Sequence, residues 1–205
     1  MFRARRCNRP EQPIIIIYPH DGGHLGRLFN MRNFDPYPFY LPKLQGVMIK
    51  EVSGDILLSK ADAIAHGVAP NDHFDRGLAL SLREEFPSMY KDFRHYCRQY
   101  NPKPGSVWVW SGMGRRIINL FTQEPPETDQ SRPGRASIIH VNQTLRDLAK
   151  IVEEQGLESI AITRLATGVG GLDWEEVKPL IYQYLDPLKI PVYVYSTYVK
   201  DAQSV

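Results

Sequence analysis

The sequence RLATGVGGLDW, at residues 164–174, joins a strand-like stretch to a helix-like one. Before it lies the apolar run SIAIT, at residues 159–163, and after it residues 175–181 (EEVKPLI) have a helical pattern. Three of the four residues 168–171 are glycine. Glycine reaches positive φ at low cost and lets a ligand approach the backbone, and the first N–H groups of a helix are free to bind phosphate oxygens. The stretch therefore predicts either an anion-binding loop or a tight strand-to-helix turn.

A second stretch of the same kind lies nearer the N-terminus. Residues 61–67 (ADAIAHG) have the pattern of a short buried strand, residues 68–77 (VAPNDHFDRG) that of a loop, and residues 78–86 that of a helix, which Pro87 ends. Just upstream, residues 53–57 read SGDIL. Two strand-loop-helix units in one chain favour the anion-binding interpretation of both loops.

Together these motifs resemble the macrodomain family of ADP-ribose-binding modules. The matching pieces are Gly54-Asp55-Ile56 after the first core strand, Ala65-His66 with the later Gly77-Leu78-Ala79, and the glycine loop that ends in Leu172-Asp173-Trp174. The resemblance extends from Val47 to about Tyr198. It is strongest to the branch of ADP-ribosyl hydrolases that includes bacterial antitoxins, which strip ADP-ribose from protein or DNA. It therefore implies a chain that binds ADP-ribose.

The alternation of patterns continues through the rest of the chain. Strand patterns occupy residues 47–52, 106–110, 116–121 and 190–195, and helical patterns occupy residues 88–99, 138–152 and 174–185. Strands that alternate with amphipathic helices predict an α/β fold, here a three-layer α/β/α sandwich around a mixed, mostly parallel sheet. Ligands bind such sheets at the carboxyl ends of the strands, and both glycine-containing loops fall there.

Composition sets the broad class of the protein. The 205 residues are 42% hydrophobic and 23% charged, with a formal net charge of +2, which is ordinary for a soluble globular domain. The two cysteines, Cys7 and Cys97, lack metal-binding spacing. No run approaches the roughly 18 apolar residues of a membrane span, and IIII at residues 14–17 is too short for a signal-peptide core. We therefore expect a cytoplasmic protein with free thiols, no cofactor and no membrane partner.

Residues 1–46 differ from the remainder and form a predicted N-terminal extension. They are rich in arginine, proline and aromatic residues but lack the periodicity of an independent fold, so we expect an arm that packs on the domain at residues 47–205. His20, Asp21 and His24 flank a Gly-Gly turn. Such residues can bind a metal, but a polar turn is the commoner meaning of this pattern, and we expect no metal.

The resemblance implies roles for residues in both loops and at two strand ends. Asp55 would accept a hydrogen bond from the exocyclic amine of adenine, or alternatively would cap a turn. Tyr195 would stack on adenine, or would be an ordinary strand aromatic. Phe74 would shield the distal ribose, or would pack on the core. The full predicted ligand-binding set is Asp55, Ile56, Gly67, Asn71, Phe74, Arg76, Gly77, Thr167, Gly168, Val169, Gly170, Gly171 and Tyr195.

Catalytic residues are harder to identify. In the hydrolase branch a lysine and an aspartate act on the distal ribose, and by motif these positions fall on Gln123 and Gly170, so both reactive groups are missing. The first loop offers a replacement in Asp72, His73 and Asp75, which would poise a water molecule. The alternative interpretation of these residues is a solvated polar loop in which Asp75 caps the following helix. Arg76 would hold phosphate bidentately, and we interpret His66 as a buried histidine at a strand end.

The sequence is therefore compatible with three functions. The first is an ADP-ribosyl hydrolase that acts on modified protein or nucleic acid through Asp72, His73 and Asp75. The second is a binding module that recognises ADP-ribose without turnover, which the loss of the lysine and aspartate favours. The third is recognition of nucleic acid or another adenine nucleotide, with Trp108, Trp110 and the N-terminal arginines supplying stacking and charge. The oligomeric state stays open.

Overall fold

The computed structural model describes residues 48–128 and 130–205. The predicted N-terminal extension, residues 1–46, lies outside the described residues, and so does the polar turn at His20, Asp21 and His24. The boundary between extension and domain stays a prediction. Across the part of the chain that is described, none of the helices has the length and apolar character that a membrane crossing requires.

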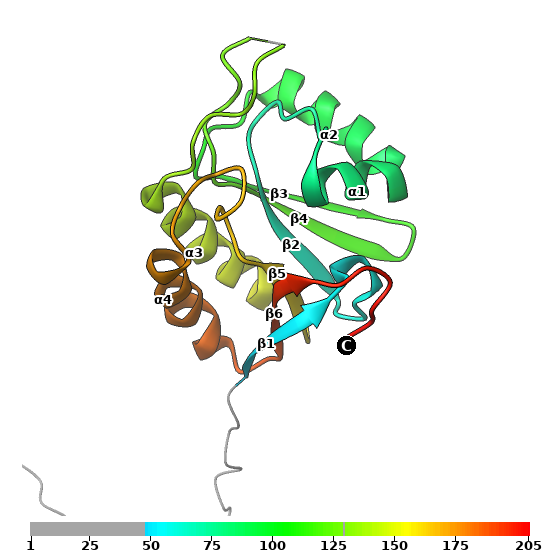
Figure 1. The fold of residues 1–205 in the computed structure, drawn as a ribbon, viewed down its shortest axis with the longest axis vertical. Helices are drawn as coiled ribbons and strands as arrows, with labels where there is room; N and C mark the ends of the chain where they lie inside the picture. Colours follow the sequence, from blue (N-terminus) through cyan, green and yellow to red (C-terminus); the bar gives the residue numbers. More distant parts are fainter. Residues whose placement is uncertain (1–47, 129) are drawn as a thin grey trace, which may run out of the picture. The chain divides into compact units, whose positions relative to one another are not determined.

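Six strands form a single sheet with the order β1-β6-β5-β2-β4-β3 (Figure 1). Neighbouring strands are parallel except at one edge, where β3 runs antiparallel to β4. This confirms the mixed, mostly parallel sheet. The strands are β1 (Ile49–Gly54), β2 (Ala63–Val68), β3 (Val107–Gly112), β4 (Arg115–Phe121), β5 (Ile160–Thr163) and β6 (Val192–Tyr198).

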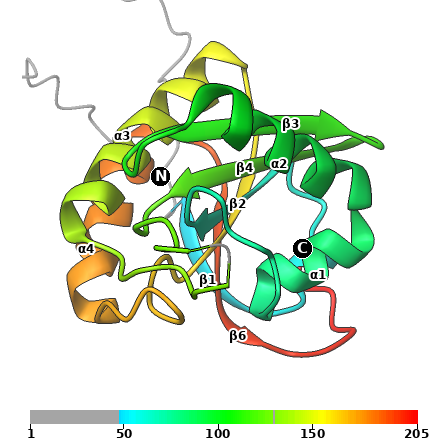
Figure 2. The same ribbon diagram turned by 90° about the horizontal axis from the view of Figure 1, so that it is seen from above.

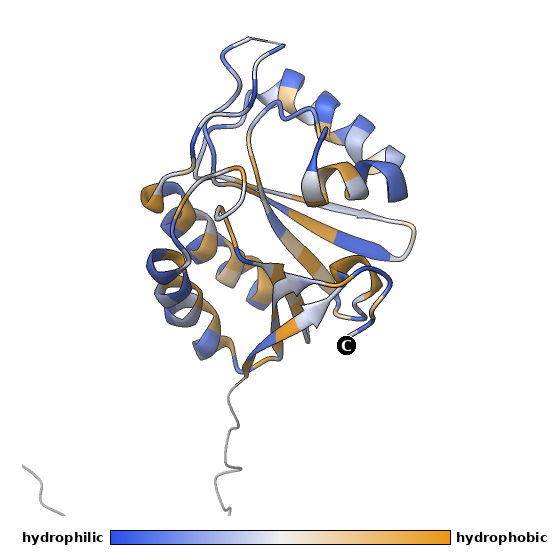
Figure 3. Ribbon diagram, viewed as in Figure 1, coloured by the Kyte–Doolittle hydropathy of each residue, from blue (hydrophilic) through white to orange (hydrophobic). Residues whose placement is uncertain are grey.

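Two pairs of helices cover the two faces of the sheet, so the predicted three-layer sandwich is confirmed (Figure 2). One face packs against α3 and α4, and the other packs against α1 and α2. Apolar residues gather on the strands and on the sheet-facing sides of α3 and α4 (Figure 3). The α-helices are α1 (Gly77–Glu85), α2 (Pro87–Tyr100), α3 (Ile138–Glu154) and α4 (Trp174–Leu185), and two short 3-10 helices are η1 (Ile56–Leu58) and η2 (Asp186–Leu188).

Local sequence explains where the two helices on the α3–α4 face begin. Ser137 caps α3, because its hydroxyl oxygen accepts a hydrogen bond from the backbone N–H of His140 at 3.2 Å. Asp173, the penultimate residue of the glycine motif, caps α4 by accepting from the N–H of Glu175 at 3.3 Å. Glu175 and Glu176 then add negative charge to the first turn, which the helix dipole favours.

The carboxyl ends of five strands meet at one edge of the sheet, because β1, β6, β5, β2 and β4 are all parallel. Both predicted loops start there: residues 69–76 follow β2 and residues 164–173 follow β5. Gly54 and Asp55 lie at the end of β1, and Thr122 and Gln123 follow β4. The fold therefore brings four separate segments of the chain to one edge.

Candidate functional site

Two adjoining cavities open at this edge. The first has a volume of about 220 Å³ and lies between the two loops, and the second has a volume of about 410 Å³ and lies beside the end of β1. They share Gly77, Leu78 and Thr163, so they form one elongated cleft. Of the predicted site residues, the first cavity is lined by Gly67, Asp72, Asp75, Arg76, Gly77, Gly168, Val169 and Gly170. The second is lined by Asp55, Ile56, Gly77 and Tyr195.

Two arginines, one on α1 and one on α2, bind the backbone of the first loop, residues 69–76. Arg94 Nη1, on α2, donates to the carbonyl oxygen of Asn71 at 3.1 Å, and Arg83 Nη1, on α1, donates to that of His73 at 3.0 Å. Asn71 and Phe74 have positive φ, 58° and 52°. For phenylalanine this backbone conformation is strained, and such strain persists only where surrounding contacts impose it. The loop therefore has one well-defined path past the cavity.

The strained backbone turns the Phe74 side chain away from the cavity. Its ring is fully buried and contacts the rings of Phe93 and Tyr90, with centroids 4.7 and 5.5 Å apart, and that of His66 edge-on at 5.9 Å. Asn71, His73 and Phe74 do not line either cavity. Of the three residues predicted to act on the ribose, Asp72 and Asp75 reach the first cavity and His73 does not.

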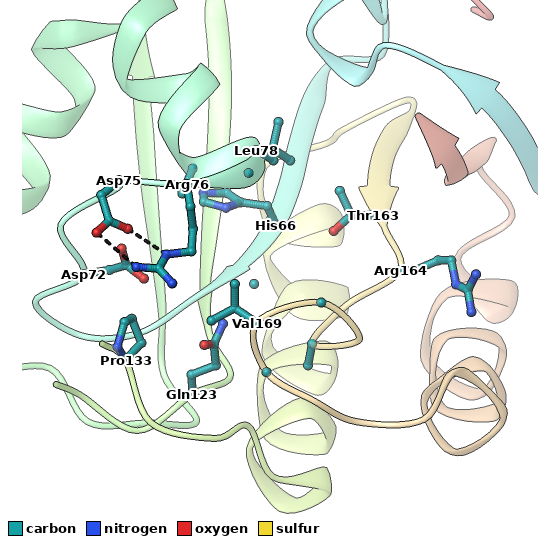
Figure 4. Close-up of a pocket in the computed structure, with 16 residues that line it drawn as sticks. His66, Asp72, Asp75, Arg76, Leu78, Gln123, Pro133, Thr163, Arg164 and Val169 are labelled. Carbon is teal, nitrogen blue, oxygen red and sulfur yellow. Dashed lines mark hydrogen bonds and ion pairs between the residues drawn. The ribbon is translucent and has the colours of Figure 1, made fainter. Parts of the chain in front are cut away.

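Arg76 and Asp75 form an ion pair at the wall of the first cavity (Figure 4). Arg76 donates from Nε and Nη2 to the two carboxylate oxygens of Asp75, at 2.9 and 3.2 Å. These hydrogen bonds lower the pKa of Asp75. The alternative role for Asp75 as a helix cap is wrong, because Arg76 is the N-cap of α1 and no side chain caps this end. The first N–H groups of α1 are thus open to the cleft.

Asp72 has the opposite electrostatic environment. Its Oδ1 accepts from the N–H of Phe74 at 2.7 Å, which fixes the carboxylate beside the cavity. Removal of the carboxylate from water raises the pKa of Asp72, and this is the largest effect. The nearby charge of Asp75 also raises the pKa, whereas the backbone hydrogen bonds lower it by less. Of the two carboxylates, Asp72 is therefore the one more disposed to accept a proton.

His66, at the cavity end of β2, is 2% exposed. Asn119 Nδ2 donates to the carbonyl oxygen of Trp108 at 3.4 Å, so Asn119 Oδ1 faces the imidazole and accepts from Nε2–H of His66 at 2.8 Å. Burial lowers the pKa of His66 to about 4, although the bond to Asn119 acts in the other direction. The interpretation as a buried histidine matches this environment, in which the ring is neutral at pH 7.

This histidine predicts a loss of stability in mild acid. The unfolded chain takes up a proton at His66 below about pH 6.5, whereas the folded chain does so only near pH 4. The free energy of unfolding should therefore fall as the pH drops from 6.5 to 4, by on the order of 3 kcal/mol. Urea unfolding of the wild type and of His66→Gln across this range measures it. Equal pH slopes for the two proteins would contradict the assignment.

The glycine loop offers its backbone to the first cavity. Gly171 N–H and Leu172 N–H donate inside the loop, to the carbonyl oxygens of Gly168 at 3.1 Å and Ala166 at 3.0 Å. Within the described residues, the N–H groups of Gly168, Val169 and Gly170 have no such partner. Thr167 instead donates through its hydroxyl to the carbonyl of Arg164 at 2.9 Å, and neither Thr167 nor Gly171 lines a cavity. Three consecutive backbone N–H groups at the wall of the first cavity therefore lack a backbone acceptor, and anion binding by this loop stays a prediction.

Two of the glycines that line the first cavity, Gly168 and Gly170, differ in the space around them. A Cβ atom placed on Gly168 has no neighbouring atom within 4 Å, so a side chain there would extend into open space. A Cβ on Gly170 would lie 2.6 Å from the carbonyl oxygen of Ala166 and 2.8 Å from Ala136 Cβ. Gly170 is thus required by close packing, which leaves no room for an aspartate in this backbone.

Gln123 is a cavity residue that the predicted site set did not include. It follows β4, pairs with Ala136 in an isolated bridge, and is 5% exposed. Its Oε1 atom is buried without a hydrogen-bond partner. The signal that could have identified it is its place after a strand parallel to β2, which brings it to the same edge of the sheet.

Asp55 has the capping role that the sequence allowed, and it also lines the second cavity. Its Oδ1 accepts from the N–H of Leu57 at 3.0 Å and so caps η1, while the residue also lines the cavity. Its own N–H donates to the carbonyl of Ala202 at 2.8 Å, so the C-terminal segment fixes this corner. Tyr195 is 7% exposed, and its hydroxyl is buried without a partner. This end of the cleft holds an aromatic ring, a carboxylate and an unpaired hydroxyl.

Comparison with known proteins identifies relatives of the whole domain. The macrodomain of Thermus aquaticus DarG has a similar structure, with a TM-score of 0.63 and 26% identity over 72% of this chain and 97% of that one. Among curated proteins, the DNA ADP-ribosyl glycohydrolase of Thermus aquaticus is 29% identical over 153 residues, 72% of this chain. The DNA ADP-ribosyl transferase-DNA ADP-ribosyl glycohydrolase fusion protein of Thermosipho africanus is 25% identical over 204 residues, 88% of this chain.

The chain spans about half the length of these curated relatives, 41% of the first and 52% of the second. The family model described as Macro domain matches residues 65–181, which include both loops of the cleft and the helices that follow them. The resemblance seen in the sequence motifs is confirmed by this match and by the fold. The chain belongs to the Macro domain family.

Proposed function

We propose that the cleft binds ADP-ribose and that the protein removes ADP-ribosyl groups from a modified substrate. Two chemically different cavities meet at Gly77, Leu78 and Thr163, and this observation is the main support for the proposal. An adenosine diphosphate with a second ribose is an elongated molecule with an aromatic end, an anionic centre and a hydroxyl-rich end. The cleft offers matching groups in the same order.

Each part of the ligand has suitable partners. The Asp55 carboxylate can accept from the exocyclic amine of adenine, and the ring of Tyr195 supplies apolar contact. The free N–H groups at the start of α1 and at residues 168–170 suit the diphosphate, because both sites present backbone donors to an anion. The distal ribose then occupies the part of the first cavity that Gln123 and Asp72 line.

Hydrolysis at this site would use Asp72 as the general base. A water oxygen forms a bond to the anomeric carbon C1″ of the distal ribose, the bond from C1″ to the modified group breaks, and its electron pair leaves with that group. The attacking water gives a proton to the Asp72 carboxylate. The raised pKa of Asp72 suits this step, because it makes the carboxylate a better proton acceptor than an exposed aspartate. The neighbouring Asp75 is hydrogen-bonded to Arg76, which lowers the pKa of Asp75 and keeps its carboxylate ionised.

The substrate that we propose first is ADP-ribosylated DNA. Both curated relatives described above carry DNA ADP-ribosyl glycohydrolase in their names. ADP-ribosylated protein is the alternative target. The same cleft serves both, since the modification and not its carrier occupies it.

A binding module without turnover is the second candidate function. It is favoured by a neutral amide at residue 123 and by a close-packed glycine at residue 170, where the resemblance implies the reactive lysine and aspartate. In that case Asp72 would contact the ribose without activating water. The two functions differ only in the fate of the bond at C1″.

Two measurements on the purified chain separate these functions. Calorimetric titration with ADP-ribose, with AMP and NAD as comparison ligands, tests binding. Incubation with ADP-ribosylated DNA and ADP-ribosylated protein, followed by quantification of released ADP-ribose, tests turnover in the wild type and in Asp72→Asn. Release that Asp72→Asn loses supports the hydrolase, and binding without release supports the binding module. Absence of ADP-ribose binding at millimolar concentration would exclude both.

Replacement of Asp55 tests the adenine end. Asp55→Ala should weaken ADP-ribose binding by about 1–3 kcal/mol, because the exocyclic amine of adenine would lose its acceptor. Asp55→Asn is the matched control, since its amide oxygen can keep both the cap on η1 and one ligand hydrogen bond, and it should lose less. Calorimetry gives the affinities and thermal unfolding checks the fold. Unchanged affinity in Asp55→Ala would move adenine recognition elsewhere.

A further inference from the structure

A third hollow lies at the edge of the sheet opposite the cleft, where β2 and β4 begin and the β3–β4 hairpin turns beside η1 (Figure 1). Its volume is about 600 Å³, larger than that of either cavity of the cleft. Among the residues that line it, three carry a positive charge and one carries a negative charge: Lys60, Arg115, Arg116 and Asp62. The proposed function uses none of these residues, so their gathering calls for a separate explanation.

The hairpin that forms one wall of this basic hollow has a fixed shape. Met113 and Gly114 have positive φ values of 52° and 70°, a combination that belongs to a tight two-residue hairpin turn. Arg115 Nη1 donates to the carbonyl oxygen of Ser59 at 2.6 Å, and Nη2 donates to that of Leu57 at 3.4 Å. These bonds join the hairpin to η1 and the residue that follows it. The fold itself therefore holds one guanidinium group at the hollow.

The positive charges of the basic hollow have no carboxylate partner. Within the described part of the chain, Lys60, Arg115 and Arg116 take part in none of the ion pairs. Asp62, the one acidic residue of the lining, accepts instead from the backbone N–H of Glu158 at 2.7 Å. Lys60 is exposed, and the two arginines are half-buried. Because partly buried charges are screened by salt less than exposed ones, the hollow should attract anions.

The rim of the basic hollow favours a nucleic-acid strand over a small anion. Met113, between the lining residues Gly112 and Gly114, is 74% exposed, and Leu58, on η1, is 41% exposed. A single-stranded nucleic acid presents phosphates to cations and the faces of its bases to neighbouring side chains. Guanidinium groups bind phosphate with paired hydrogen bonds, and a methionine sulfur packs favourably on aromatic rings. A lone phosphate ion would leave most of the hollow and its apolar rim without a contact.

We infer that the basic hollow binds the phosphodiester backbone of single-stranded DNA, at a site separate from the cleft that receives the ADP-ribosyl group. The choice of DNA over an acidic peptide rests on the proposed function, in which ADP-ribosylated DNA is the first substrate. Short helix η1 lies between the two sites: Ile56 lines the second cavity, and Leu57 accepts from Arg115 of the hollow. A strand bound in the hollow therefore passes close to the adenine end of the cleft.

Binding of unmodified DNA tests the inference without any ligand in the cleft. The probe is a fluorescently labelled single-stranded oligonucleotide of about 20 nucleotides, which exceeds the usual site size of a single-strand-binding domain. We expect the anisotropy to report binding whose logarithmic salt slope is about −2, because three neutralised phosphates contribute roughly −0.7 each. No binding by the full chain at low salt would overturn the inference. Tighter binding of a polyglutamate peptide would also overturn it and would assign the hollow to an acidic protein.

Charge-reversal variants assign the binding to the hollow. Lys60→Glu and Arg116→Glu should each weaken DNA binding about tenfold and make its salt dependence shallower. Arg115 is left unchanged, because it also braces η1. Lys103→Glu, at an exposed lysine near the other end of the β3–β4 pair, is the matched control and should keep the wild-type DNA affinity. Thermal unfolding shows whether each variant is folded.

ADP-ribose titration of the same proteins separates the possible failures. Lys60→Glu and Arg116→Glu should bind ADP-ribose as the wild type does, because neither residue lines the cleft. If the wild type binds ADP-ribose but not DNA, the proposed binding by the cleft stands and the inference is wrong. DNA binding that both variants keep would come from elsewhere in the chain, such as the arginines of residues 1–46, and would also overturn the inference. Loss of DNA binding in both variants supports the inference even if ADP-ribose does not bind and the proposed function fails.

Discussion

Gly168→Glu should abolish ADP-ribose binding while the domain keeps its stability. A Cβ atom at this position meets nothing within 4 Å, so the backbone tolerates a side chain. Gly168 lines the first cavity, whose volume of about 220 Å³ leaves little room for a glutamate side chain beside a ribose. Its carboxylate would also lie near the N–H groups of residues 168–170, which the proposal assigns to phosphate. We expect a loss of affinity of about a hundredfold or more, since steric blocking and charge repulsion act together.

Calorimetric titration with ADP-ribose measures this loss, and thermal unfolding shows whether the fold is retained. Gly168→Ala is the control, because a single methyl group adds no charge and occupies far less of the cavity. It should bind ADP-ribose with a much smaller loss than Gly168→Glu. If Gly168→Glu has the wild-type thermal unfolding midpoint and still binds ADP-ribose at the wild-type affinity, the assignment of this loop to the diphosphate is wrong.

The sequence predicted the fold well because its signals are local and repeated. Each of the two strand-loop-helix units has an apolar run, a loop with glycine and a helix, and a chain that alternates such patterns can form few sheets. Helix α4 begins at Trp174 and ends at Leu185, as the sequence predicted, because Asp173 marks its start. The end of β6 was harder to place: it continues to Tyr198 because β1 pairs with it as far as Gly54, a contact between distant parts of the chain.

The cleft was predictable at the level of loops and less so at the level of side chains. Residues 69–76 have no periodicity, so the sequence could not show which of their side chains face the ligand. That depends on the positive φ of Asn71 and Phe74. Asparagine is a common residue in that conformation, but phenylalanine is not, and only the packing of its ring reveals it.

Gln123 shows a different limit of sequence reasoning. The resemblance located the position but implied a lysine there, so the glutamine first appeared as a missing catalytic group. The structure shows instead a buried residue that lines the cavity and whose amide oxygen has no hydrogen-bond partner. Whether an acceptor lacks a donor is a property of its three-dimensional surroundings, and no spacing in the chain reports it.

Phe74→Ala should destabilise the domain by about 3–5 kcal/mol, which is typical of removing a fully buried aromatic ring. The ring fills the space between His66, Tyr90 and Phe93, and its loss leaves a cavity behind the first loop. Because domains of this kind are stable by only about 5–15 kcal/mol, the variant should unfold at a much lower urea concentration. Urea unfolding of the wild type and of Phe74→Ala measures the difference.

Two features make this experiment decide between the alternatives for Phe74. Phe74→Leu keeps most of the apolar volume, so it should lose clearly less stability than Phe74→Ala if the ring serves the core. A ring that shielded the distal ribose would give the opposite pattern, with stability nearly unchanged and ADP-ribose affinity reduced in both variants. Because Phe74 also fixes the backbone between Asp72 and Asp75, we expect folded Phe74→Leu to bind ADP-ribose somewhat more weakly, through a loosened loop. In Phe74→Leu the loss of unfolding free energy should exceed the loss of ADP-ribose binding free energy. A larger loss in binding than in stability would indicate that the ring contacts the ligand.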